Sequence, residues 1–398
     1  MRKLENAAFP HWALQSSAGA YGRKQVGGAV TRGLANNLFT ATRSAIGITV
    51  SVILALTILC STAMPQSGST PLPRDGTQIL LLGTHGSPGL SKERSQPSSL
   101  LIVDGHLYLI DCGIGTMRQM VMAGVRSADV GTIFITHHHL DHDLDLANIM
   151  ANDFLGLNRT GTTINIYGPP QTEELVEAGF KYISIPLTVQ AAEGALGDTK
   201  LIGPKGPKVN PFTAHNIQHD GVVYQDEKVR VIAAENSHFA MMPAQLRTQM
   251  KMKSYSYRFE TPHGVIVFTG DTGPSDAVTQ LAKGADVLVS EGGLISEALR
   301  GWQETAEKDH WPPEVLKAMV NHAKEHLDFE EVGEIASKAQ VKSVLLYHLV
   351  YAEDSKARLI SGVKKHFSGL VFAGADFDRY CLGEAGKSTS SSILSLCH

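Results

Sequence analysis

The side chains best suited to chemistry in this sequence lie in one short stretch, residues 133–146, which reads IFITHHHLDHDLDL. After four apolar or β-branched residues come three consecutive histidines and an Asp-His pair, namely His137, His138, His139, Asp141 and His142. Imidazole nitrogens and carboxylate oxygens are ligands for Zn²⁺ and similar cations. Core packing accounts for one such histidine but not for the whole run, so the stretch predicts a metal site.

Three further apolar segments, far apart along the chain, also end at a histidine or an aspartate, which are His238, Asp271 and His348. If these segments are strands, their ends converge on one edge of the sheets. In an extended chain alternate side chains point the same way, so His137 and His139 can share one ion while His138 faces away. Asp141 and His142 lie at the turn into the next helix and can reach a second ion.

The elements that must position these residues are strands and helices that alternate across residues 78–383. Residues 100–103 and 107–110 are joined at Asp104-Gly105, a pair typical of a tight hairpin. Hairpins in both halves of the chain favour mixed sheets over a single parallel sheet. We therefore predict an α/β fold in which two mixed β-sheets pack face to face with helices outside.

The composition is that of a globular protein, with 398 residues of which 43% are hydrophobic and 19% charged. Residues 1–63 hold six Lys or Arg and one Glu, which leaves 29 basic and 38 acidic residues, a formal charge of −9, on the rest. An acidic body repels a phosphate backbone, so the sequence disfavours nucleic acid as a partner.

The N-terminal residues 1–64 combine a basic lead with an uncharged apolar run at 45–59 that is followed by Ser-Thr-Ala. This pattern is typical of a secretory signal cleaved after Ala63, or of an uncleaved membrane anchor. Basic residues on the N-terminal side keep that end in the cytoplasm, so both versions predict a catalytic domain that is periplasmic, secreted or anchored outside. A true start near Met64 would instead make the protein cytosolic.

Four segments carry weaker signals. Residues 65–77 predict a loose linker, and residues 384–398, with an STSSS run, predict a disordered tail. Residues 194–211 predict a mobile surface loop or a substrate-contacting arm, and residues 299–313 predict a lid or a packed aromatic cluster. The four cysteines have neither a CxxC pair nor even spacing, which predicts neither a zinc finger nor a disulfide framework.

Taken together, the motifs resemble the metallo-β-lactamase superfamily of binuclear metal hydrolases. THHHLDH (136–142) matches the superfamily's signature motif and FTGDT (268–272) its motif with a bridging aspartate. The resemblance implies a four-layer αβ/βα sandwich of two mixed β-sheets and two Zn²⁺ ions, with Mn²⁺ or iron left open. It also implies that one zinc is held by His137, His139 and His238, the other by Asp141, His142 and His348, and that Asp271 bridges them.

Within the superfamily the chain resembles the branch that contains ribonuclease Z, the metallo-type arylsulfatases and some cyclic-nucleotide phosphodiesterases. The segments that carry this resemblance are LLGTHGSPG (81–89), IDCGIGTMRQM (110–120), SYSYRFE (254–260) and residues 325–348. In that branch a further histidine donates a proton, and His326, which lies 22 residues before His348, stands in the matching place, with His322 as a weaker rival.

Two departures separate the chain from ribonuclease Z. Where that enzyme usually carries His-Glu-Ala-Thr, this chain has Ser290-Glu291-Gly292-Gly293, so the glutamate is kept and the histidine is not. The long tRNA-binding arm of ribonuclease Z is matched at best by the short sequence GPKGPK at 203–208. Both departures weaken the expectation of tRNA processing.

The mechanism that the resemblance implies uses two cations to lower the pKa of a shared water, Asp141 to orient the hydroxide, and His326 to protonate the leaving oxygen. The sequence thus predicts an exported zinc hydrolase that cleaves a phosphodiester or sulfate ester of a small molecule. The alternatives are a tRNA 3′-end endoribonuclease if the protein is cytosolic, a lactonase or β-lactam hydrolase, and a metal-dependent binding protein without turnover. Membrane contact is expected only through the N-terminal anchor, and a homodimer stays open.

Overall fold

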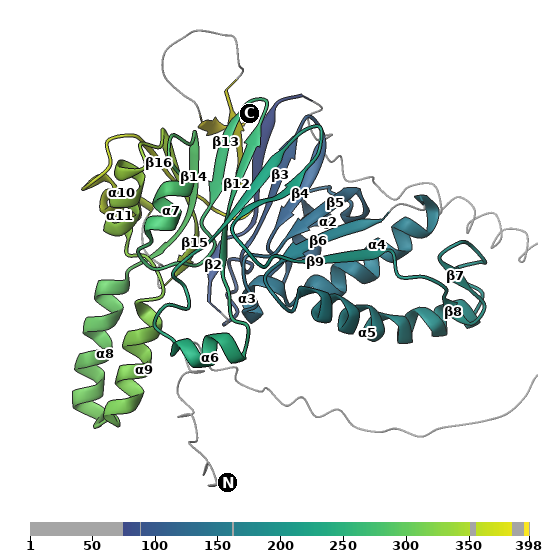
Figure 1. Ribbon diagram of the computed structural model, residues 1–398, viewed down its shortest axis with the longest axis horizontal. Helices are drawn as coiled ribbons and strands as arrows, with labels where there is room; N and C mark the ends of the chain where they lie inside the picture. Colours follow the sequence, from purple (N-terminus) through teal and green to yellow (C-terminus); the bar gives the residue numbers. More distant parts are fainter. Residues whose placement is uncertain (1–74, 88, 161–162, 351–355, 384–393, 398) are drawn as a thin grey trace, which may run out of the picture. The chain divides into compact units, whose positions relative to one another are not determined.

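The structure is a computed structural model that describes residues 75–87, 89–160, 163–350, 356–383 and 394–397. The predicted signal or anchor and most of the predicted linker lie outside these residues. Within them the chain forms two large β-sheets flanked by helices (Figure 1). The predicted α/β fold with two face-to-face sheets is therefore confirmed.

Each of the two large sheets has eight strands. The first has the order β18 (Leu394–Leu396), β17 (Arg379–Leu382), β1 (Thr77–Gly83), β3 (Ser98–Val103), β4 (His106–Ile110), β5 (Val130–Phe134), β6 (Ile164–Gly168), β9 (Phe212–Asn216). The second has the order β10 (Gly221–Gln225), β11 (Arg230–Glu235), β12 (Tyr255–Thr261), β13 (Gly264–Phe268), β14 (Val287–Gly293), β15 (Ser343–Val350), β16 (Leu370–Ala373), with β2 (His85–Gly86) paired to β15. Both sheets are mixed, because β4, β5, β6 and β9 pair in parallel, as do β13 to β16 and β2 with β15, while the other neighbours are antiparallel.

Apolar side chains form a core on both faces of each sheet. In β1, Ile79 and Leu81 face the second sheet whereas Leu80 and Leu82 face the helices, as the two-residue period of a strand requires. The first sheet is covered by α2 (Thr116–Met122), α4 (Leu146–Thr160) and α5 (Thr172–Ala192), and the second by α7 (Asp276–Leu281), α10 (Phe329–Lys338) and α11 (Lys356–Lys364). The result is the four-layer αβ/βα sandwich that the resemblance to the metallo-β-lactamase superfamily implied.

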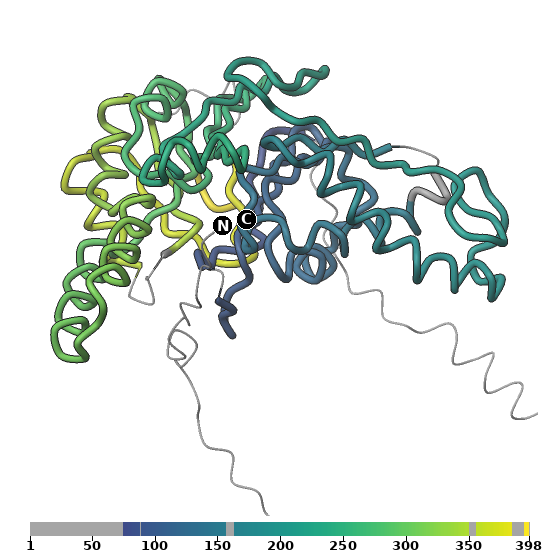
Figure 2. Tube along the Cα trace, turned by 60° about the horizontal axis from the view of Figure 1, so that its bottom comes forward, coloured from purple at the N-terminus to yellow at the C-terminus, as the bar shows by residue number. Residues whose placement is uncertain are grey.

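Two hairpins extend away from the sheets (Figures 1 and 2). One consists of the end of α5 followed by β7 (Ile202–Gly203) and β8 (Gly206–Pro207), so the segment 194–211, for which the sequence left a mobile loop or a substrate-contacting arm open, contains a short β-hairpin. The other pairs α8 (Ile295–Asp309) with α9 (Pro313–Ala323), and here Trp302 packs on Ile295 and Ala323. Trp302 therefore fits the packed-cluster alternative for residues 299–313. No helix in the described ranges is long and apolar enough to cross a membrane.

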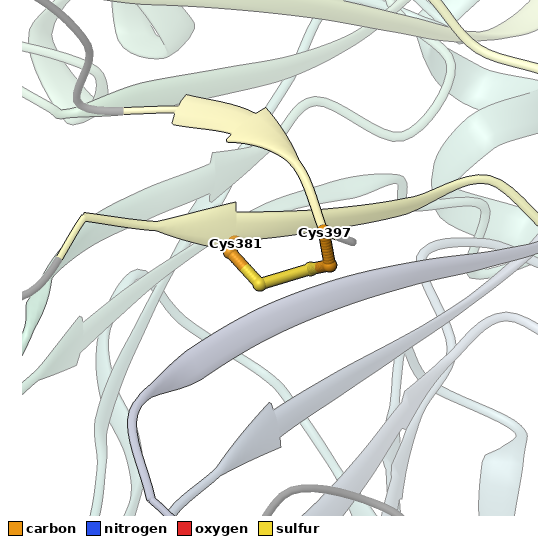
Figure 3. Close-up of a disulfide and its surroundings, with 2 residues drawn as sticks. All are labelled: Cys381 and Cys397. Atoms are coloured by element: carbon orange, nitrogen blue, oxygen red, sulfur yellow. A yellow bond between two sulfur atoms is a disulfide. The ribbon is translucent and has the colours of Figure 1, made fainter. Parts of the chain in front are cut away.

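A disulfide between Cys381 and Cys397 joins β17 to β18 (Figure 3). β18 pairs antiparallel with β17, and Leu394 is fully buried between the sheets. The cysteine spacing had not indicated this single disulfide, and the prediction of a disordered tail is wrong for residues 394–397. The two cysteines meet because of the register of two strands, which their spacing along the chain does not reveal.

One buried carboxyl group in α4 has no role in positioning the metal-binding residues. Asp153 is fully buried, and this burial raises its pKa to about 7, with a smaller opposing contribution from the Ser127 hydroxyl and a raising contribution from Asp129. The protonated carboxyl is therefore the form that the fold favours. The contribution of this protonated group to the free energy of unfolding is complete below the ordinary pKa of 3.8. It is lost as the pH rises through about 7.

Replacing Asp153 by Asn should consequently stabilise the protein at alkaline pH. The shift corresponds to at most about 4 kcal/mol, so we expect Asp153→Asn to raise the free energy of unfolding by roughly 2–4 kcal/mol at pH 8 and by less than about half as much at pH 5. Urea unfolding as a function of pH measures this difference. The exposed Asp309→Asn is the control, and a gain for Asp153→Asn that is equal at both pH values would contradict the assignment.

Candidate metal centre

The seven predicted ligands come together where four strands end at one edge of the two sheets. His137 and His139 follow β5, and His139 is the N-cap of α3 (Leu140–Asp143), whose first turn carries Asp141 and His142. The remaining three follow β11 or β13 or lie in β15, and they are His238, Asp271 and His348. All except His139 are almost fully buried.

Their metal-binding atoms form two groups within which all such atoms lie within 4.8 Å of one another. The first ligand group consists of His137, His139, His238 and Asp271, and the second ligand group consists of Asp141, His142 and His348. This division has the same members as the one that the sequence resemblance implied. Asp271 also reaches the second group, because its Oδ1 lies 3.1 Å from His348 Nε2 and 3.3 Å from His142 Nε2.

The arrangement of nitrogen and oxygen atoms fits divalent cations. Ring nitrogens face one another, with His137 Nε2 2.9 Å from His139 Nδ1 and His142 Nε2 3.2 Å from His348 Nε2. Asp271 Oδ1 is buried without a hydrogen-bond partner among the described residues. Buried acceptors that converge without donors are unfavourable unless a cation lies among them.

The ionisation of these residues points the same way. Burial lowers the pKa of His137 and of His238 well below the usual value, which keeps both rings in the neutral form that binds metals. Burial would raise the pKa of Asp271, but the rings of His348 and His142 hold it well below its usual range. The first ligand group therefore offers the neutral rings of His137 and His238 beside the Asp271 carboxylate. In the second ligand group, burial would lower the pKa of His142, but the carboxylates of Asp271 and Asp111 hold it well above its usual value.

Asp111, a residue that the sequence motifs did not assign to the site, supports the second ligand group. Its Oδ2 lies 2.9 Å from His142 Nδ1, and its Oδ1 accepts a hydrogen bond from the Thr136 backbone N–H at 2.7 Å. Asp111 thereby fixes the ring of a ligand, as an acid behind a metal-binding histidine commonly does. The sequence feature that could have identified Asp111 is its position directly after the apolar strand β4. The turn beyond it is tight, since a Cβ on Gly113 would lie 2.0 Å from the Asp141 carbonyl oxygen.

His138 lies between two ligands but faces away from both groups, as expected. Its Nδ1 lies 2.9 Å from Asp143 Oδ2 and its Nε2 3.3 Å from the Thr172 hydroxyl. His215 is also outside the site, because it lies in β9 and stacks on Tyr167.

His326 lies beside the ligands but belongs to neither group. It is 6% exposed, and its ring packs against those of His238 and His348 at centroid distances of 5.2 and 6.0 Å. Its Nδ1 lies 3.1 Å from an oxygen of Glu291, a fully buried residue whose other oxygen accepts from the Thr272 N–H. Burial alone would lower the pKa of His326, but the Glu291 carboxylate raises it to about 9. His322, in contrast, is half exposed.

Adjacent histidines provide a matched test of the metal-binding assignment. We expect His139→Ala to lower the zinc content from about two ions per chain to about one, because it removes a ring that faces the first ligand group. His138→Ala should keep both ions, since that ring points elsewhere. Metal analysis after gel filtration distinguishes the two variants, and equal loss of zinc from both would show that the ring directions are misassigned.

Comparison with known proteins agrees with this geometry. A β-lactamase superfamily domain is recognised over residues 106–349. Ribonuclease Z of Mycobacterium bovis (strain BCG / Pasteur 1173P2) is 27% identical over 310 residues, which cover 76% of this chain and 97% of that protein. Ribonuclease Z of Mycobacterium marinum is 26% identical over 310 residues, with coverage of 76% and 97%.

Solved structures show the same fold. YhfI, a metallo-β-lactamase-fold protein from Bacillus subtilis, has a TM-score of 0.54 at 17% identity and covers 77% of this chain and 98% of its own. The short form of human tRNase Z has a TM-score of 0.50 at 17% identity and covers 76% and 98%. The chain therefore belongs to the β-lactamase superfamily, as a metallo-β-lactamase-fold hydrolase of the branch that contains ribonuclease Z.

Proposed function

We propose that this hydrolase cleaves phosphodiester bonds in RNA with two bound zinc ions. The curated relatives named ribonuclease Z support the bond type and the polymer. The observation that carries the proposal is the pair formed by His326 and Glu291, in which the Glu291 carboxylate orients the imidazole at the edge of the ligand groups and raises its pKa. Such a group suits a reaction in which an alkoxide oxygen leaves.

The two ligand groups are the place for the zinc ions, which imidazole and carboxylate ligands suit. Bound there, the ions would supply a water of lowered pKa and would neutralise charge that develops on the phosphate. Asp141 lies in the second ligand group, with an oxygen 3.8 Å from His348 Nε2 and 3.9 Å from His142 Nε2. Burial opposes its ionisation, but these rings lower its pKa to about 2, so its carboxylate can accept a hydrogen bond and orient the attacking water.

In this proposal His326 supplies the proton that the leaving oxygen takes up. As the bond from phosphorus to the leaving oxygen breaks, the His326 ring donates its proton to that oxygen. Glu291 keeps the ring oriented through Nδ1, so the other nitrogen is the donor. The relatives do not support sulfate ester cleavage.

A second candidate is endonucleolytic processing of tRNA 3′ ends, which the relatives favour by name. Cleavage of a precursor tRNA at its 3′ trailer by the purified protein is its test. The segment 194–211, where the sequence suggested a short counterpart of a tRNA-binding arm, is here a short hairpin at the end of α5. Precise trailer removal would establish this candidate, whereas cleavage at many positions in an unstructured RNA would favour a general phosphodiesterase.

Replacing His326 tests the role of the proton donor. His326→Ala should slow cleavage of an RNA dinucleotide, whose leaving group is an alkoxide, by about 10²- to 10⁴-fold. It should change hydrolysis of bis(p-nitrophenyl) phosphate little, because p-nitrophenolate needs no proton. Glu291→Gln should act in the same direction, and His322→Ala should leave both rates intact. An equal loss on both substrates for His326→Ala would contradict this role.

We also propose that the protein is exported and that its metallo-β-lactamase-fold domain folds in an oxidising compartment. The basic and apolar N-terminal residues and the Cys381–Cys397 disulfide support this, since disulfides persist mainly outside the reducing cytosol. Cell fractionation followed by alkylation of the denatured protein is the test. We expect the protein outside the cytoplasm with Cys381 and Cys397 resistant to alkylation until reduction. Finding it in the cytosol with both cysteines free would contradict export.

A further inference from the structure

A pocket lined by charged, amide and apolar side chains lies outside the two ligand groups and contains no ligand residue. It has a volume of about 540 Å³. One wall is α6 (Ala244–Gln249) with the residues that follow it, and the opposite wall is the start of α5 with the end of β9. Arg247, Lys251 and Lys253 come from the first wall, and the amides of Asn216 and Gln218 from the second.

Both walls are tied to residues that flank the ligands. The loop from His238 to α6 begins with Phe239, whose ring packs at centroid distances of 4.7 Å from His238 and 5.4 Å from His139. On the opposite wall, the Thr172 hydroxyl lies 3.3 Å from the His138 ring. A group bound in the pocket would therefore be a neighbour of a substrate held at the metal centre.

The pocket is positively charged although the body around it is acidic. Its lining holds three cationic side chains against one carboxylate, Glu235. Glu235 is paired with Lys253 at 2.7 Å, while Lys251 lies 3.8 Å from Glu174 with both side chains 60% exposed. Two positive charges thus remain for a ligand, since a pair as exposed as Lys251 and Glu174 interacts weakly.

Among these residues, Arg247 gives the strongest indication of a bound anion. Its side chain makes no hydrogen bond or ion pair with any described residue, and its Nε is buried without a partner. A guanidinium carries five N–H donors in a planar fork that matches the oxygens of a phosphate. A buried donor of this kind without an acceptor is unfavourable unless a ligand supplies one.

We propose that this pocket is an anion subsite in which Arg247, assisted by Lys251, binds a phosphate group of the substrate next to the scissile one. The inference rests on the proposed phosphodiesterase function and narrows it. A molecule with a single phosphodiester leaves the pocket empty, whereas a nucleic-acid strand fills it with the neighbouring phosphate. The favoured substrate is therefore an oligonucleotide and not a small ester.

The test compares a substrate that reaches the pocket with one that does not. With a short RNA oligonucleotide, Arg247→Ala should raise KM about 10- to 100-fold and leave kcat nearly unchanged. With bis(p-nitrophenyl) phosphate both constants should stay within about twofold, because that substrate carries one phosphate. Arg247→Lys should restore part of the loss, and Arg126→Ala, which removes an exposed cation elsewhere, is the charge-matched control.

The outcomes separate this inference from the function on which it rests. Equal effects of Arg247→Ala on both substrates, or no effect on either, would overturn the subsite while phosphodiester hydrolysis stands. Absence of any phosphodiester hydrolysis would instead refute the proposed function. In that case, fluorescence anisotropy with a phosphorothioate oligonucleotide decides the subsite alone. We expect at least tenfold weaker binding by Arg247→Ala and a smaller dependence on salt, and unchanged binding would overturn it.

Discussion

Imidazoles and carboxylates from four strand ends lie buried against one another at the edge of this fold, and the rest of the structure depends on holding them there. So many polar groups in a dry site are unfavourable without cations and without a rigid frame. The frame is the contact between the sheets next to the histidines. The Tyr257 hydroxyl donates to the Ile135 carbonyl at 2.6 Å, and the Tyr255 N–H donates to the Thr136 carbonyl at 2.9 Å. The core between the sheets thus fixes the distance between the ligands of β5 and those of the second sheet.

The sequence predicted the fold and the strand ends that carry the metal-binding residues because the relevant rules are local, while the division into two ligand groups came from the resemblance to the metallo-β-lactamase superfamily. An apolar strand that ends in histidine or aspartate is visible in the chain, and alternation along a strand separates His138 from its neighbours. The support from Asp111 depends on a turn that brings it behind His142, and the disulfide depends on the register of β17 and β18. Neither of these follows from spacing, because strand register is set by tertiary packing. The order in residues 194–211 also escaped prediction, since β7 and β8 are only two residues long each.

The net charge of the chain is a global property and does not describe the charge at a particular binding site. A formal charge of −9 on residues 64–398 disfavours nucleic acid as a partner, yet the relatives are ribonucleases. The pocket lined by Arg247 offers a way to reconcile the two, because the field at a binding site depends on the few charges that line it. Arg247, Lys251 and Lys253 fall in a segment with little periodicity, so only the structure groups them. In this account substrate choice depends on that segment, while the bond that is cleaved depends on the ligand groups.

The central claim is that the two ligand groups hold two metal ions that share Asp271. Anomalous X-ray diffraction at the zinc edge, from crystals grown with excess zinc, tests this claim most directly. The account predicts two anomalous peaks, one within each ligand group, with Asp271 between them. A single peak, or peaks bound by residues outside the two groups, would contradict it.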